Sequence, residues 1–322
     1  NFTKRGINMQ KFEELLNEWL KYTEIQVKPS TYACYLRLAR THIYPFFKDV
    51  PMDAVDQNML SSFITKKLDN GRLDGGGGLS EKTVRDLMSI ITSVCKYAEI
   101  VYKIPHPSLL KWRNTHSPKP IKVFSRQEQK ILEAYLSDSL TPSTMGILIC
   151  LYSGLRLGEI CALRWDDLDI DQHILHVRRT VQRIYRQDHT RTTEIIIGVP
   201  KTRQSIRDIP IASRLWPILA TYKTHFGAAS CIISEKNRPF MDPRTYQLQY
   251  RKYLAECGLP YRNFHALRHT FATRCIENNI DLKSLSEILG HASVNLTLNR
   301  YVHSSMDLKR SQIEKLCKDF NF

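Results

Sequence analysis

A short basic segment with two prolines divides the chain into two parts of different character. Residues 113–122 read Arg-Asn-Thr-His-Ser-Pro-Lys-Pro-Ile-Lys. Proline removes a backbone donor and interrupts helices, so this composition is typical of an extended connection between domains. We therefore expect two domains, residues 1–112 and 123–322, joined by a linker at 113–122. A chain of 322 residues is long enough for two separate cores.

The first part has the periodicity of helices throughout. Apolar residues at spacings of three and four predict helices over residues 9–23, 28–43, 57–70 and 80–98. Four glycines at 75–78 mark a loop before the last of them. We expect the first domain to be all-α.

The second part mixes helices with short strands. Ser125 and Glu128 have the spacing of a capping box that opens a helix, and residues 143–152 predict an apolar helix. Three β-branched runs bounded by polar loops predict strands at residues 174–181, 194–199 and 207–211. The expected fold class is mainly α with a small antiparallel β-sheet, in which an all-helical domain precedes an α+β domain.

Composition indicates a polyanionic partner. Lys and Arg number 47 against 32 Asp and Glu, which gives a formal charge of +15 and a pI near 9.4. Such a balance is typical of nucleic-acid-binding proteins, although other acidic surfaces also attract basic chains. No apolar run approaches the roughly 20 residues that cross a membrane, and the first residues lack a signal peptide's apolar stretch, so a cytoplasmic protein is expected. The eight cysteines form no CxxC pair and predict reduced thiols.

An ordered set of arginines and histidines with one late tyrosine stands out in the second part. The set lies in Gly-Leu-Arg156-Leu-Gly-Glu, His265-Ala-Leu-Arg268-His, Leu-Gly-His291 and, ten residues later, Tyr301. A guanidinium fork grips two phosphate oxygens, and two forks can neutralise the charge on a pentacoordinate phosphorus. Tyrosine supplies a hydroxyl nucleophile. The set therefore suits attack on a phosphodiester.

This order and spacing resembles the tyrosine recombinase, or phage-type integrase, family, whose signature is Arg, Lys, His-x-x-Arg, His and a Tyr near the C-terminus. The resemblance is carried by residues 120–305 and, through their helical and basic character, by residues 8–112. It implies a core-site DNA-binding domain and a catalytic domain that together clamp a DNA duplex. The catalytic residues that it implies are Arg156, Lys201, His265, Arg268, His291 and Tyr301.

The resemblance also implies the reaction. Tyr301 attacks a DNA phosphodiester and forms a 3′-phosphotyrosine, and a 5′ hydroxyl from the partner strand reverses the step, with no cofactor required. Lys201 donates a proton to the leaving 5′ oxygen, although outside the family pattern it reads as a solvated turn residue. An ordinary tyrosine has a pKa of roughly 10 and needs a base, for which His265 is the candidate.

Two further residues are expected to support this set. Glu159 is expected to orient Arg156, or else to serve the dipole of the helix that starts there. His269 shares one side of a helix with His265 and Arg268, and it fits a structural hydrogen bond as well as a phosphate contact. A zinc site would want His-Glu-x-x-His, whereas alanine follows the first histidine here, so no metal is expected.

Other basic residues are candidates for contact with the DNA backbone. The arginine-rich segment 174–200 is long for a simple connection and is either a basic hairpin on DNA or a solvated loop. The candidates are Lys28, Arg37, Arg40, Lys119, Lys122, Arg178, Arg179, Arg183, Arg186 and Arg203.

The implied function is site-specific recombination that integrates or excises a mobile element. The implied partners are double-stranded core sites, further copies of the chain from dimer to tetramer, and excision or host DNA-bending factors, in the cytoplasm with the nucleoid. A catalytically silent DNA-binding regulator and a type IB topoisomerase stay open as alternatives. Leu308, Ile313 and Leu316 predict an amphipathic tail helix that packs on its own domain or on a neighbouring protomer. Because the chain does not begin with Met, an arm-site DNA-binding domain is expected ahead of it.

Overall fold

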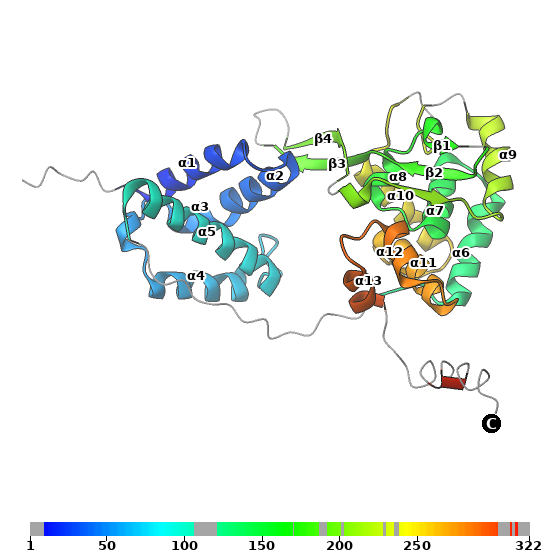
Figure 1. Ribbon diagram of the computed structural model, residues 1–322. Helices are drawn as coiled ribbons and strands as arrows, with labels where there is room; N and C mark the ends of the chain where they lie inside the picture. The colour runs from blue at the N-terminus through cyan, green and yellow to red at the C-terminus, as the bar shows by residue number, and fades with distance from the viewer. Residues whose placement is uncertain are drawn as a thin grey trace, which may run out of the picture. The chain divides into compact units, whose positions relative to one another are not determined.

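The computed structural model divides the chain into two compact units, Asn1–Pro118 with Ile184–Glu194, and Lys119–Arg183 with Ile195–Phe322 (Figure 1). The expected linker lies outside the described residues except for its last two, so its bounds stay a prediction. The structure describes residues 10–105, 121–169, 171–186, 192–200, 203–227, 230–234, 238–301, 310, 313 and 314.

Residues 10–105 of the first unit form helices joined by turns, as predicted. They are α1 (Phe12–Glu24), α2 (Pro29–Leu38), the π-helical turn η1 (Ala39–Ile43), α3 (Tyr44–Phe47), the 3₁₀ turn η2 (Met52–Ala54), α4 (Gln57–Asn70) and α5 (Glu81–Tyr102). The side chains of Asp56 and Ser80 accept hydrogen bonds from backbone N–H groups in the first turns of α4 and α5, which explains where these helices start. In the core between the helices, the ring of Phe12 stacks on that of Phe47, and the ring of Phe63 lies tilted against Phe47.

The second unit packs its helices around a central apolar one. They are α6 (Arg126–Asp138), α7 (Pro142–Ser153), α8 (Leu157–Cys161), the 3₁₀ turns η3 (Trp165–Asp167) and η4 (Arg203–Ser205), α9 (Trp216–Phe226), α10 (Pro243–Glu256), α11 (His265–Glu277), α12 (Leu282–Leu289) and α13 (Val294–Tyr301). Helix α7 is buried on nearly every side and packs against α6, α10 and α11. The predicted capping box at Ser125 and Glu128 opens α6. None of the helices in the described ranges has the length and apolarity to cross a membrane.

The strands form two small sheets. β1 (Leu168–Asp169), β2 (Ile174–Val177) and β5 (Arg207–Pro210) make a three-stranded antiparallel sheet, while β3 (Thr180–Tyr185) pairs with β4 (Thr193–Gly198) in another. The predicted strand over 174–181 is therefore two strands. The chain leaves the first sheet after Val177, where Arg179 pairs with the buried carboxylate of Asp167.

Gly290 ends α12 and brings the next residue, His291, into the turn before α13, as predicted. The φ of Gly290, 63°, lies in the left-handed region, which residues with a side chain disfavour. A Cβ added there would lie 3.0 Å from Cδ of Arg207 and 3.0 Å from the backbone oxygen of Gln204. The end of α12 can therefore lie directly against the segment that leads into β5.

Replacing Gly290 by alanine is expected to lower the free energy of unfolding by about 2–3 kcal/mol, through left-handed strain and the crowding of Arg207. Gly258 is a matched control, because its φ is 66° and a Cβ there meets nothing within 4 Å. Gly258→Ala should cost only the strain, about 1 kcal/mol. Urea unfolding of both variants measures the difference. Equal losses would contradict the close packing inferred at the end of α12.

Candidate active site

Three consecutive carbonyl oxygens at the end of α12 each accept a hydrogen bond from a different arginine. In residues 288–290, Arg207 donates to the first carbonyl, Arg268 to the second at 2.6 Å and Arg156 to the third at 3.0 Å. The last carbonyls of a helix have no partners within it and carry partial negative charge, which stabilises nearby cations. The end of α12 thus collects guanidinium groups from the start of α8, from β5 and from α11.

Arg156 is fixed on one side and open on the other. Its Nη1 donates to Oε1 of Glu159 at 2.7 Å, and its backbone N–H donates to Oε2 at 2.9 Å. The Arg156 side chain remains 33% exposed, whereas that of Glu159 is 3% exposed. This geometry fits the expected role of Glu159 in orienting Arg156.

Arg207 was not among the residues predicted from the sequence, yet it shares Glu159 with Arg156. Its Nη1 and Nη2 donate to Oε1 and Oε2 of Glu159 at 3.0 and 2.9 Å. Burial acts to raise the pKa of Glu159, but the charges and hydrogen bonds of Arg207, and then of Arg156, outweigh it and hold this pKa below its ordinary 4.5. Glu159 is therefore ionised at neutral pH.

Arg268 lies deepest. It is 1% exposed, and its Nη1 donates to the backbone oxygen of Gly154, which ends α7, at 2.9 Å. Burial lowers the pKa of its guanidinium. Arg268 thus ties the ends of α7 and α12 together, and a phosphate would meet only its small exposed edge.

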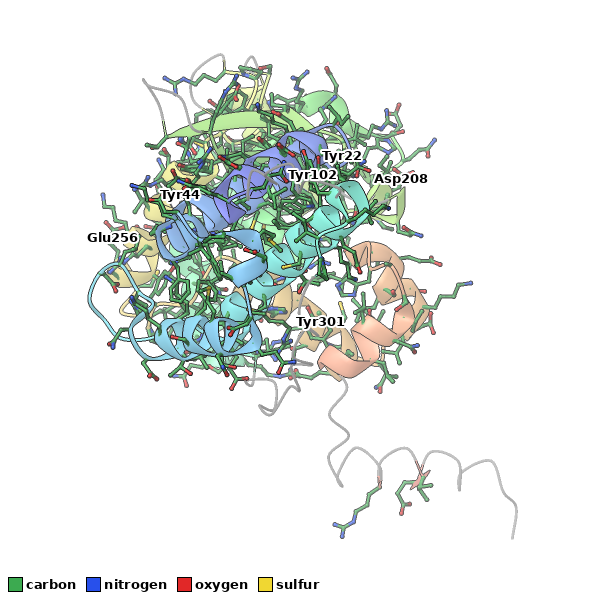
Figure 2. The ribbon with its side chains drawn as sticks, turned by 90° about the vertical axis from the view of Figure 1, so that its left-hand side faces the viewer. Tyr22, Tyr44, Tyr102, Asp208, Glu256 and Tyr301 are labelled. Carbon is green, nitrogen blue, oxygen red and sulfur yellow. The ribbon has the colours of Figure 1, made fainter. Side chains whose placement is uncertain are left out.

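Tyr301, the last residue of α13 (Figure 2), lies beside two histidines, His269 and His291. Its hydroxyl lies 2.7 Å from Nδ1 of His269. The ring of His265 stands edge-on to that of His269, with centroids 4.6 Å apart, and the ring of His291 lies parallel to that of Tyr301 at 6.4 Å. Thr297, one turn before Tyr301, holds Nδ1 of His291 at 2.8 Å.

A cleft of about 410 Å³ opens beside Arg156 and His291. Polar side chains of β3 line it as well, and sequence reasoning missed them because nothing in a strand pattern marks which strand faces a cleft. Pro200 lines the cleft too, whereas Lys201, the predicted proton donor, lies outside the described residues. The lining residues are Arg156, Glu159, Thr180, Gln182, Pro200, Ser205, Gly290, His291, Ala292 and Leu296.

The predicted DNA-binding residues fall into two groups. Lys28, Arg37, Lys122 and Arg178 are exposed, and Arg40 is half-buried with its guanidinium 5.5 Å from the ring of Tyr44. Three others make ion pairs within the chain: Arg179 with Asp167, Arg183 with Asp242 and Arg186 with Glu194. Lys119 and the side chain of Arg203 lie outside the described residues.

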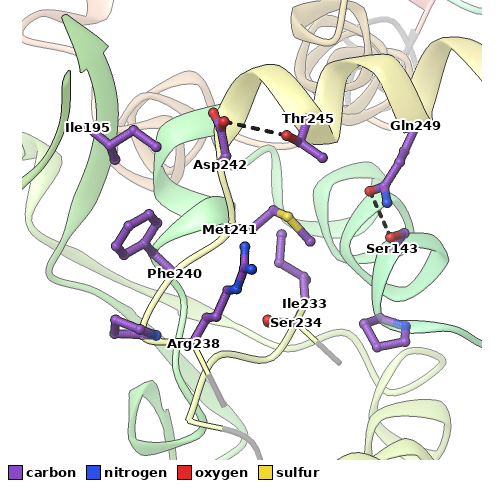
Figure 3. Close-up of a pocket in the computed structure, with 12 residues that line it drawn as sticks. Ser143, Ile195, Ile233, Ser234, Arg238, Phe240, Met241, Asp242, Thr245 and Gln249 are labelled. Carbon is purple, nitrogen blue, oxygen red and sulfur yellow. Dashed lines mark hydrogen bonds between the residues drawn. The ribbon is translucent and has the colours of Figure 1, made fainter. Parts of the chain in front are cut away.

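A second cavity, of about 610 Å³, contains none of the predicted catalytic residues (Figure 3). It lies between α7, α10 and the segment before α10, and its carboxylate, Asp242, accepts from the Thr245 hydroxyl and pairs with Arg183. Within the described ranges, no three His, Cys, Asp or Glu side chains are grouped to hold a metal ion.

Glu159→Gln is expected to be about 3 kcal/mol less stable than the wild type at pH 7, because it leaves the buried Arg207 and the half-buried Arg156 without their counter-charge. Since the folded-state pKa of Glu159 lies below 4.5, its ionised form adds stability above about pH 4.5, and this contribution is lost as the pH falls through the lower folded-state value. The difference in the free energy of unfolding between the wild type and Glu159→Gln, measured by urea unfolding, should therefore shrink below pH 4.5. The exposed Asp138→Asn serves as control, and a gap that stays constant with pH would contradict the assignment.

Known proteins resemble this chain in sequence. Residues 123–307 match the Phage integrase family, and residues 11–68 match the N-terminal SAM-like domain of phage integrases. A tyrosine recombinase XerC-like protein of Caldanaerobacter subterraneus subsp. tengcongensis is 28% identical, over 98% of this chain and 86% of its own length. The ICEBs1 integrase of Bacillus subtilis is 24% identical, over 95% of this chain and 82% of its own length.

The fold agrees as well. The structure of the Tn1549 transposon integrase in complex with a circular intermediate DNA has a TM-score of 0.76 at 20% identity, and covers 95% of this chain and 99% of that one. The predicted mainly helical fold and the predicted enzyme class, a tyrosine-type site-specific recombinase, are confirmed. The family match spans more than half of the chain, and the chain belongs to the phage integrase family.

Proposed function

We propose that the chain is the recombinase of a bacterial mobile element, and that it cuts and rejoins the strands of double-stranded DNA through Tyr301. The observation that carries this proposal is the convergence of Arg156, Arg268 and His291 on the end of α12, with Tyr301 in contact with His269 beside them. Fixed guanidinium groups suit the charge of a pentacoordinate phosphorus.

Each step of the reaction exchanges one ester bond at the phosphorus for another. The Tyr301 oxygen bonds to the phosphorus as the bond to the 5′ oxygen breaks, and the leaving oxygen takes a proton from Lys201. The 5′ hydroxyl of the partner strand then attacks the phosphotyrosine, and the tyrosine leaves. Charge is supplied by the arginines and by His291, in the role that a metal ion has in other phosphoryl-transfer sites.

Tyr301→Phe is expected to bind nicked duplexes from the ends of the element but to form no covalent adduct, because it lacks the nucleophile. Wild type should give an adduct that survives denaturant. Tyr261→Phe, a change of the same size at an exposed tyrosine, is the matched control and should form it too. Binding without an adduct from wild type would favour the catalytically silent regulator. An adduct with plasmid relaxation but no strand exchange would favour the topoisomerase.

We further propose His269 as the group that receives the proton of Tyr301. The separation of 2.7 Å is hydrogen-bond distance, which is the first requirement for a general base. His265, the candidate from sequence, touches the ring of His269 and would pass the proton on or orient that ring. The helical spacing that grouped both histidines could not distinguish these roles.

His269→Ala is expected to slow adduct formation at pH 7 by about 100-fold or more, and the deficit should narrow as the pH approaches the roughly 10 at which tyrosine ionises unaided. His265→Ala should slow the reaction less and without this recovery. Single-turnover cleavage of a nicked duplex from pH 6 to 10 measures both. A slower reaction in His265→Ala than in His269→Ala would return the base to His265.

The wider assembly follows from the chemistry. Exchange between two duplexes needs four strand cuts, so we propose a dimer on each core site and a tetramer in the reaction, acting on DNA in the cytoplasm with the nucleoid. The two units, joined by residues 113–122, would clamp the duplex, with the exposed Lys28, Arg37, Lys122 and Arg178 on its phosphates. Excision or host DNA-bending factors would set direction.

A further inference from the structure

We propose that Arg207 is a positioning residue for DNA cleavage, acting on Arg156 through Glu159 and through the end of α12. The inference rests on the proposed function, since it assigns to Arg207 the orientation of a group that binds the scissile phosphate. The observation behind it is that the Arg207 guanidinium bonds both to the Glu159 carboxylate and to the end of α12. The same carboxylate also binds Arg156, and the same helix end binds Arg156 and Arg268.

The donors of Arg207 are directed at protein acceptors. Nε donates to the backbone oxygen of Ile288, Nη1 to Oε1 of Glu159 and to the backbone oxygen of Ser205, and Nη2 to Oε2 of Glu159. The side chain is 6% exposed. Arg207 therefore acts on DNA through its neighbours, in contrast to Arg156, which is 33% exposed beside the cleft.

The arrangement fixes the plane of a carboxylate. Two parallel hydrogen bonds from Arg207 hold both oxygens of Glu159, and Arg156 then takes its direction from the same two oxygens. Removing the Arg207 fork would let the carboxylate turn and would leave it buried with less opposing charge. A misplacement of about 1 Å at a reacting group can slow an enzyme by about 100-fold.

A lysine cannot do the same work. Its ammonium is a single point charge on a flexible stem, whereas the flat guanidinium reaches Ile288 on one edge and Glu159 on another. Arg207→Lys keeps the charge and loses the fork, so it tests geometry apart from electrostatics.

The test compares Arg207→Met and Arg207→Lys with Arg262→Met. Arg262 is a matched control in the same unit, because it also makes two bonds to one carboxylate, at 2.8 and 3.1 Å to Glu128, and is 14% exposed. Its contacts with the Glu128 carboxylate and with the ring of Phe124 lie outside the predicted catalytic residues. Measured are the melting temperature, the affinity for a nicked duplex and the single-turnover rate of adduct formation at saturating DNA.

Both Arg207 variants are expected to bind DNA within a few fold of wild type and to form the adduct about 100-fold more slowly at saturating DNA. Arg262→Met should lose comparable melting temperature and keep the wild-type rate. Because Arg207→Met alone leaves Glu159 buried with less opposing charge, the pair Glu159→Leu and Arg207→Met is made as well. It should regain stability, since apolar pairs replace buried ion pairs well, and stay slow.

Coupling to Arg156 is the decisive measurement. If Arg207 acts through Arg156, the variant that combines Arg156→Lys with Arg207→Met is no slower than Arg156→Lys alone. Three results would each overturn the inference: a double variant whose rate loss is the product of the two single losses, a wild-type rate for Arg207→Met, or equal slowing by Arg262→Met. In each case an adduct from the wild type would still uphold the proposed function. Absence of an adduct from the wild type would instead reject the proposed function itself.

Discussion

The attraction between the end of α12 and three arginines is the interaction on which the site depends. Guanidinium groups repel one another, and here they come from the start of α8, from β5 and from α11 to meet three adjacent carbonyls. The partial negative charge of the helix end and the full charge of Glu159 offset that repulsion. The offset is incomplete, because one carboxylate faces two of the arginines, and the remaining positive charge is available to a phosphate.

This interaction also explains how motifs far apart in the chain become one site. Helix α11 packs against α7 and against α12, so Arg268 lies between Gly154 and the end of α12. Tyr301 packs on the small apolar cluster that α11 and α12 share, in which Leu285 and Leu289 are fully buried. Arg268 and Tyr301, the proposed nucleophile, are therefore positioned by one set of packed helices.

Much of this could be predicted from the sequence, for identifiable reasons. The helices, the capping box at Ser125 and the turn at Gly290 follow from local periodicity and backbone preference, and both can be recognised in short stretches of sequence. Arg207 could not be found that way, since its importance lies in contacts with Glu159 and with a backbone oxygen 81 positions away. The choice between His265 and His269 as the partner of Tyr301 likewise depends on how α13 packs on α11.

The acceptors at the end of α12 belong to the main chain, which makes them tolerant of one kind of change and intolerant of another. Each residue at positions 288 and 289 presents the same backbone carbonyl to its arginine whatever its side chain is. Substitutions that still pack there therefore keep these hydrogen bonds. Inserting or deleting a single residue in α12 would instead rotate its end by about 100°. The length of this helix, more than its residues, is then what evolution and protein engineering must preserve.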